Sequence, residues 1–362
     1  MSSAKNILYI GPYREESNRG FYAYMNIKAL QKAGHNIKTI PRFCEKYLNN
    51  KIFNDIADLE KNNFDRYDIC IQHCGNSEFV YHSDFERNIG ICDISGFDPD
   101  PIINNNLFLL DQIVVNCKVK LKVLQNIVSS KLYDKFVYSP QLLDCANIEE
   151  YKTPETFEWM EKDRFYFYTE LNFTEQYDWE KLIYTYVTTF TNSNTGLILK
   201  TNNLSKEKSQ LVLEDIRDIL TDSRLKANDN NMPILINNVL DKSDLAKIYS
   251  NVHCFVDVNK TNEASYSVLN LAAMNKHIIS NDRLTTSSYL TNCLHVNSMI
   301  CNSQAAYYND ITDNNIYNYY YTMDNNDLRQ SMITAYYSRH KQIDDLHDDI
   351  SQYDISNINN LL

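Results

Sequence analysis

Short apolar runs alternate with segments of helical spacing along almost the whole chain. Residues 6–10 form the first apolar run, and turn-forming residues 11–20 follow it. Apolar side chains then recur at helical spacing over residues 21–33, and Gly34 stands where a helix C-cap glycine belongs. Residues 36–40 resume the strand pattern. A strand–loop–helix–strand unit of this kind directs the helix N-terminus towards the carboxyl edge of a parallel sheet, where anionic ligands bind.

The same alternation continues in two series. The first series predicts further strands at 67–73, 87–93, 112–115 and 136–138, with a helix at 118–128. The second predicts strands at 164–168, 196–200, 233–236, 254–257 and 277–280, separated by helices at 179–190, 206–220, 244–249 and 266–274. The expected fold is therefore α/β, with two Rossmann-like domains in tandem whose parallel sheets face a central cleft.

The domain boundaries follow from where the alternation weakens. We expect one domain over 1–145, a linker over 146–162 and a second domain over 163–325. Residues 326–362 have a mainly helical pattern. A chain of 362 residues is longer than one ordinary hydrophobic core supports, which agrees with two domains.

Composition excludes several classes of protein. A net charge of −12 argues against an extended nucleic-acid-binding surface, which needs clustered Lys and Arg. Nine cysteines without a C-x-x-C pair indicate reduced thiols in the cytoplasm, and no metal-ligand cluster is visible. No apolar run is long enough to span a membrane, and no signal segment opens the chain. Six of the seven glycines precede residue 100, so a glycine-rich phosphate loop is expected only in the first half.

A family resemblance is sharpest between Ser243 and Asp282. The segments that carry it are 244–249 (DLAKIY), 252–256 (VHCFV), Glu263 and 271–279 (LAAMNKHII). In order and pattern they resemble the GT-B glycosyltransferases, specifically the retaining, glycogen-synthase-like branch that includes glycosyltransferase family four and its bacterial and viral relatives. Residues 11–14 with Gly20, and residues 165–172, are also similar to that branch.

The resemblance implies an activity. Such an enzyme transfers a sugar from a nucleotide-diphosphate sugar, with UDP or GDP as the nucleotide, to an acceptor hydroxyl on a glycan or another molecule. It retains the anomeric configuration and needs neither a bound metal nor a cofactor. It also implies that the last helix, from about residue 326, returns to the first domain. The sequence leaves the sugar, the acceptor and the oligomeric state open.

The resemblance places a donor site in the second half. It assigns Glu263 to the donor sugar and the backbone N–H groups of Ala264, Ser265 and Tyr266 to the diphosphate. A carboxylate accepts hydrogen bonds from sugar hydroxyls, and a helix N-terminus binds phosphate. The alternative is that Glu263 only complements the dipole of the helix that follows it.

Two lysines are candidates to replace missing phosphate contacts. The family's E-G-F-G is replaced by residues 263–266, its second Glu by Leu271, and residues 172–177 lack the basic pair expected on the diphosphate. Lys200 ends a strand that should face the cleft, and Lys260 lies three residues before the candidate carboxylate. Either lysine is alternatively a solvated strand end or loop residue.

The first half supplies the expected acceptor site. His73 and Asp93 each follow a predicted strand, where the family has histidines near the reacting hydroxyl. Arg14, Arg19 and Gly20 line the first loop, and Gly20 would allow close approach of a ligand. The alternatives are a structural histidine, an Asp that caps a turn, and a glycine required only by the turn.

Other readings compete with the transferase. A non-catalytic GT-B relative that binds or scaffolds would explain the missing cations. A Rossmann-type oxidoreductase or epimerase is disfavoured because no G-x-G-x-x-G follows the first strand. The D-x-D at 98–100 is flanked by prolines and is interpreted as a loop, and the tyrosine-rich run 317–321 as aromatic packing.

Overall fold

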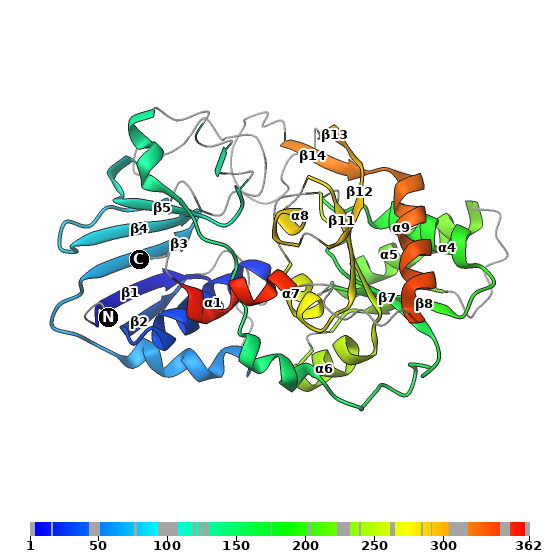
Figure 1. Cartoon of the computed structure of the whole chain (residues 1–362), viewed down its shortest axis with the longest axis horizontal. Coiled ribbons are helices and arrows are strands. Elements are labelled where there is room, and N and C mark those ends of the chain that lie inside the picture. The colour runs from blue at the N-terminus through cyan, green and yellow to red at the C-terminus, as the bar shows by residue number, and fades with distance from the viewer. Residues whose placement is uncertain are drawn as a thin grey trace. The chain divides into compact units, whose positions relative to one another are not determined.

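The computed structural model divides the chain into two compact units (Figure 1). Unit 1 comprises residues 1–145 with 351–362, and unit 2 comprises residues 146–350. The structure describes residues 4–15, 17–42, 51–75, 78–92, 108–118, 121–122, 125, 130–174, 176–201, 204–222, 232–238, 240–260, 265–283, 285–290, 292–303, 318–340 and 348–358.

Unit 1 contains a six-stranded parallel sheet in the order β2-β1-β3-β4-β5-β6. Its strands are β1 (Asn6–Gly11), β2 (Asn36–Pro41), β3 (Ile69–Cys74), β4 (Arg87–Cys92), β5 (Gln112–Val115) and β6 (Phe136–Tyr138). All six were predicted from the sequence. The strand order reverses between β1 and β3, and such a reversal in an open parallel sheet is where ligands bind.

The first helix of unit 1, α1 (Asn18–Lys32), has conventional ends. Ser17 is the N-cap, and its side chain accepts a hydrogen bond from the N–H of Gly20 at 3.0 Å. Gly34 follows the helix with a φ of +86°, a backbone conformation that favours glycine. The short helices of this unit are η1 (Lys51–Lys61), η3 (Ser130–Lys135) and η8 (Ile355–Asn357), while η4 (Cys145–Tyr151) joins the two units. Most of the helix predicted at 118–128 lies outside the described residues.

Unit 2 contains a second six-stranded parallel sheet, in the order β12-β11-β10-β7-β8-β9. Its strands are β7 (Phe165–Glu170), β8 (Thr195–Lys200), β9 (Ile234–Ile236), β10 (Cys254–Asp257), β11 (His277–Asn281) and β12 (Leu294–Val296). Its helices are α4 (Trp179–Phe190), α5 (Lys206–Asp222), α6 (Lys242–Asn251), α7 (Tyr266–Ala273), α8 (Thr285–Tyr289) and α9 (Asn325–Tyr337). Read from β9 to β12, this is the 3-2-1-4-5-6 order of nucleotide-binding sheets.

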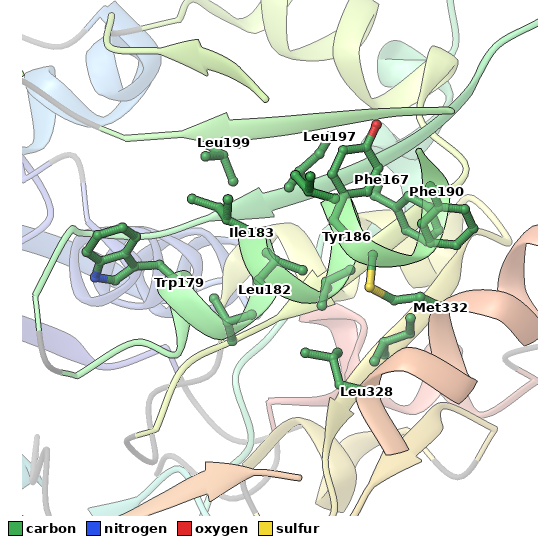
Figure 2. Close-up of a cluster of buried hydrophobic side chains, with 14 of the residues drawn as sticks. Phe167, Trp179, Leu182, Ile183, Tyr186, Phe190, Leu197, Leu199, Leu328 and Met332 are labelled. Atoms are coloured by element: carbon green, nitrogen blue, oxygen red, sulfur yellow. The ribbon is translucent and has the colours of Figure 1, made fainter. Parts of the chain in front are cut away.

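One face of the unit 2 sheet packs on α4, α5 and α9. Figure 2 shows Phe167 of β7 and Leu197 and Leu199 of β8 beside the apolar side of α4. Leu328 and Met332 of α9 are buried in the same cluster. Burying one such side chain contributes about 1.5–3 kcal/mol. Because side chains alternate along a strand, the other residues of β7 and β8 face the opposite side of the sheet.

The C-terminal helix is shorter than predicted, and it belongs to the second unit. Helix α9 ends at Tyr337, and its apolar positions Leu328, Met332 and Ala335 pack in the unit 2 core. In Figure 1 it runs beside α4. The segment grouped with unit 1 is instead residues 351–362. The helical pattern of the sequence continued past Tyr337, whereas in the structure Ser338–His340 form the short helix η6.

Some elements were absent from the sequence prediction. Strand β12, helix α8 and the antiparallel pair β13 (Ser298–Ser303) and β14 (Asn318–Met323) were not foreseen. The predicted linker is also part of a unit. Ser250 of α6 donates a hydrogen bond to the carbonyl oxygen of Tyr151 at 2.7 Å and accepts one from the N–H of Thr153 at 2.9 Å. Residues 146–162 are thereby fastened to unit 2.

The returning C-terminal segment is tied to unit 1 through Leu143 and Asp354. Leu143 donates its N–H to Tyr353 at 2.8 Å and accepts from the N–H of Ile355 at 2.9 Å. The carboxylate of Asp354 accepts from the N–H of Cys145 at 3.0 Å and lies 3.4 Å from the ammonium of Lys32. Burial opposes ionisation here. Hydrogen bonds from Ser356 and Cys145, with the charge of Lys32, outweigh burial and lower the pKa of Asp354 to about 2.

Replacing Asp354 with Asn should loosen this attachment at neutral pH. A carboxyl group whose folded pKa is depressed contributes stability above its unfolded pKa, and that contribution is lost as the pH falls through the folded value. We expect Asp354→Asn to destabilise unit 1 by about 1–2 kcal/mol at pH 7, with the difference from wild type vanishing towards pH 2.

Hydrogen–deuterium exchange of peptides from α1 and residues 351–358 measures this loss. The exposed Asp134 of the same unit gives a matched control, and Asp134→Asn should leave the exchange unchanged. Equal exchange in Asp354→Asn and wild type at pH 7 would show that the carboxylate does not hold the segment.

Candidate functional site

The carboxyl edge of the unit 2 sheet carries three charged residues at the ends of adjacent strands. Glu170 ends β7, Lys200 ends β8 and Asp257 ends β10. Glu170 and Lys200 are register partners across the β7–β8 pair. The strand order reverses between β7 and β10, so Glu170 and Asp257 flank the reversal. In an open parallel sheet this is the expected ligand position.

These side chains share the face of the sheet that lies opposite the core of Figure 2. The Tyr168 hydroxyl donates to Glu170 Oε1 at 2.5 Å, which places both residues on one side of β7. The ring of Tyr168 contacts Phe255 of β10 and Tyr249 of α6, with centroid distances of 5.7 and 6.2 Å. Tyr249 in turn shares a 2.6 Å hydrogen bond with Ser267 in the first turn of α7. Hydrogen bonds and ring contacts between buried tyrosines therefore connect the strand end with two helices.

Asp257 is the most deeply buried carboxyl group of this edge. Its residue is 4% exposed, and it accepts hydrogen bonds from the Thr286 hydroxyl at 2.6 Å and the N–H of Asn259 at 3.3 Å. Burial outweighs these hydrogen bonds and raises the pKa of Asp257 to about 6. Sequence reasoning recognised the strand that ends at Asp257 but missed the residue. An acidic side chain at the carboxyl end of an apolar strand was the available signal.

Lys200 is buried where the sequence predicted a cleft-facing cation. The residue is 5% exposed, and its ammonium donates to the carbonyl oxygen of Thr201 at 3.1 Å. A lysine is rarely buried to this extent without compensating contacts. Its place beside the strand reversal makes it a candidate anion-binding cation.

The N-terminus of α7 is the candidate phosphate-binding element. Ser265 is its N-cap residue and is 5% exposed, yet its side chain makes no capping hydrogen bond. Its hydroxyl has no partner among the described residues, while Tyr266 begins the helix and is buried. Glu263 and Ala264 lie outside the described residues. The first N–H groups of a helix lack intrahelical partners and attract anions.

Lys260 lies at a structural junction within unit 2. Its ammonium is 3.9 Å from Asp178, the residue before α4. The Asp178 carboxylate also accepts from the Thr322 hydroxyl at 2.8 Å and from the N–H of Met323 at 2.8 Å, so it fixes β14 to α4. Through its contact with Asp178, Lys260 helps to hold β14 in place. Its assignment to the donor stays a prediction.

His73 lies at the strand reversal of unit 1 but is enclosed by side chains. It is 0% exposed, and its Nδ1 is 3.1 Å from the Tyr9 hydroxyl. The ring of Tyr22 meets it edge-on at 5.2 Å. A β-carbon on Gly11 would stand 3.1 Å from the β-carbon of His73, so the neighbouring strand requires a small residue there. These are the surroundings of a packed histidine.

The first loop of unit 1 is held by its own contacts. Arg14 pairs with Glu60 of η1, with Nε–Oε1 and guanidinium–Oε2 distances of 2.5 Å. A β-carbon on Gly20 would lie 2.0 Å from the carbonyl oxygen of Glu15, so the loop itself requires glycine. Arg19 is half-buried in the first turn of α1. Asp93 and the D-x-D segment lie outside the described residues.

The described residues contain neither a metal-binding cluster nor a membrane-spanning helix. No group of three or more His, Cys, Asp or Glu side chains within the described ranges is arranged to hold a metal ion. Among the helices that the structure describes, none has the length and apolar character needed to cross a membrane.

Replacing Asp257 with Asn should change how the stability of unit 2 depends on pH. A carboxyl group with a raised folded pKa contributes stability below its unfolded pKa, and this is lost as the pH rises through the folded value, here from about 4 to about 6. We expect Asp257→Asn, which does not titrate, to gain about 2–3 kcal/mol relative to wild type between pH 4 and pH 7.

Both tryptophans, Trp159 and Trp179, lie in unit 2, so urea unfolding followed by tryptophan fluorescence reports this unit. The exposed Asp215 of α5 supplies the control Asp215→Asn, for which no such pH-dependent gain is expected. Parallel stability curves for Asp257→Asn and wild type would contradict a buried, proton-binding Asp257.

Comparisons with known proteins bear on the fold. No protein family model and no curated protein matches the sequence. Solved structures do match. A glycosyltransferase from Rickettsia africae ESF-5 has a TM-score of 0.58 at 11% identity, covering 99% of this chain and 95% of that chain.

Two further matches are ligand-bound structures. Trehalose-6-phosphate from E. coli bound with UDP-2-fluoro glucose has a TM-score of 0.62 at 12% identity, covering 97% of this chain and 96% of that chain. The catalytic domain of starch synthase IV from Arabidopsis thaliana bound to ADP and acarbose has a TM-score of 0.61 at 9% identity, covering 99% and 96%. Identities this low establish architecture alone. The chain has the GT-B glycosyltransferase fold, with two Rossmann-like domains, as its sequence predicted.

Proposed function

We propose that the chain is a glycosyltransferase that moves a sugar from a nucleotide-diphosphate sugar to an acceptor hydroxyl. Retention of configuration, independence from metal ions and a cytoplasmic location belong to this proposal. The observation that carries it is the start of α7, where the hydroxyl of Ser265 is buried and has no partner among the described residues. A helix N-terminus of a nucleotide-binding sheet, with such a hydroxyl and Lys200 on the same sheet edge, suits an anionic ligand.

The residues of unit 2 receive the donor in this proposal. The N–H groups of Ala264, Ser265 and Tyr266 hold the diphosphate, and Lys200 supplies positive charge. Glu263 accepts hydrogen bonds from the sugar. Lys260, three residues before Glu263, contributes positive charge to the donor site. As the bond to the sugar breaks, negative charge grows on the diphosphate, and fixed N–H donors and a cation stabilise that charge.

Unit 1 receives the acceptor. Asp93 lies near the reacting hydroxyl, and Arg14, Arg19 and Gly20 shape the first loop. His73 is buried against Tyr9, so in this proposal it is a positioning residue that supports the strand reversal beside the reacting hydroxyl. Structural likeness to proteins bound with UDP-2-fluoro glucose and with ADP supports a nucleotide donor.

One observation favours a second function, a non-catalytic GT-B protein that binds or scaffolds. The segment that follows β7, residues 171–177, contains no Lys or Arg, and β7 itself ends in an acidic residue, Glu170. A diphosphate bound there meets fewer cations than its charge requires. Binding and turnover must therefore be measured separately.

Calorimetric titration with UDP-glucose, GDP-mannose and ADP-glucose tests the donor site. We expect one of these sugars to bind wild type, and Lys200→Gln to weaken that binding about tenfold or more, since a charged hydrogen bond contributes about 1.5–3 kcal/mol. Ser265→Ala should weaken it by a smaller factor. Lys206→Gln, at an exposed residue of α5, is the charge-matched control and should bind as wild type does.

Release of free nucleotide on incubation with candidate acceptors measures turnover. Absence of binding to every donor, in a protein whose tryptophan fluorescence shows it folded, would reject the transferase. Binding that survives Lys200→Gln unchanged would reject this site. Binding without turnover on any acceptor would favour the non-catalytic function.

A further inference from the structure

Within the described part of the chain, Glu170 is a carboxylate of the candidate donor edge that forms no ion pair. Among the described residues it accepts one hydrogen bond, from the Tyr168 hydroxyl to Oε1 at 2.5 Å. None of the salt bridges between described residues includes Glu170, although its register partner on β8 is Lys200. Its Oε2 atom therefore has acceptor capacity left in that part of the chain.

Two tyrosines connect the carboxylate with the start of α7. Tyr168, which is hydrogen-bonded to Glu170, has its ring 6.2 Å from the ring of Tyr249, and the charge of Glu170 adds to the effect of burial in raising the pKa of both tyrosines. Tyr249 is hydrogen-bonded at 2.6 Å to Ser267, in the first turn of α7. A ligand held at this N-terminus thus shares its surroundings with a fixed negative charge.

We infer that Glu170 sets the ligand preference of this edge, favouring a diphosphate esterified with a sugar over the free nucleoside diphosphate. The inference rests on the proposed function and names the discrimination that the same site performs. The terminal phosphate of a free nucleoside diphosphate carries an extra ionisation near pH 6, which esterification with a sugar removes. Repulsion from a nearby carboxylate is therefore stronger for the free diphosphate.

The sugar also presents hydrogen-bond donors to Glu170, which an ionised phosphate lacks. Hydroxyl groups donate hydrogen bonds, and a carboxylate with an open oxygen accepts them strongly. The same side chain consequently attracts the sugar and repels the second phosphate charge. Glu170 acts on binding and is a specificity-determining residue in this inference.

Glu170→Gln tests it, because glutamine keeps an oxygen for the Tyr168 hydroxyl and removes the charge. The probes are the pairs UDP and UDP-glucose, GDP and GDP-mannose, and ADP and ADP-glucose, titrated by calorimetry at pH 7.5. We expect wild type to bind the sugar ester of one pair at least tenfold more tightly than its free diphosphate. In Glu170→Gln the free diphosphate should bind about tenfold more tightly than in wild type, so that the preference falls to threefold or less.

The control is Glu180→Gln, an equal charge change at an exposed residue of α4, which covers the other face of the sheet. It should keep the wild-type preference. If Glu170→Gln keeps that preference too, the inference is overturned while the proposed function stands. If no ligand binds wild type or Glu170→Gln, and the variant unfolds as wild type does, the inference and the proposed function are both rejected.

Discussion

The reversal of strand order between β7 and β10 is the constraint on which the candidate site depends. Chain segments leave the two sides of a reversal in opposite directions, so the carboxyl ends of the strands there stay uncovered by a crossover. The faces of β7 and β10 must be apolar because helices cover both, whereas their last residues need polar side chains. Glu170 and Asp257 occupy those last positions, and α7, the helix that follows β10, begins at the same edge. The polar strand ends, the N-terminus of α7 and the strand order thus all locate the candidate site at this edge of the sheet.

The strands were predictable because parallel strands buried on both faces read as continuous apolar runs. Gln112–Val115 and Cys254–Asp257 are short, but their runs of Ile, Val and Phe identify them without knowledge of their neighbours. The β13–β14 pair was not predictable in this way. Its strands are rich in Ser, Asn, Tyr and Thr and become strands by pairing with each other. The predicted extent of α9 was wrong for a related reason. Burial against α4 determines which residues form this helix and which unit contains it, and the sequence does not show that contact.

For the candidate site too, the sequence shows the residue types but not the contacts between them. Residue types at strand ends were visible, which is why Lys200 and His73 were found in the sequence and lie at strand ends in the structure. Their partners were not visible. Glu60 pairs with Arg14 and Asp178 lies beside Lys260, and each partner comes from a segment far away in the sequence. A sequence shows that a cation is present, but the charge available to a ligand depends on which acid the fold brings to it.

The same principle separates an active transferase from a relative that only kept the fold. Among the described groups of this edge, the helix N-terminus contributes roughly half a positive charge and Lys200 contributes one more, while Glu170 and Asp257 each subtract up to one at neutral pH. These described groups leave no net positive charge, whereas a diphosphate brings at least two negative charges. Phosphate attraction alone then holds a donor weakly, and hydrogen bonds to the sugar must provide the remaining affinity. A site of this composition works as an enzyme only if its acidic side chains bind hydroxyl groups, because the same carboxylates oppose every phosphate that enters.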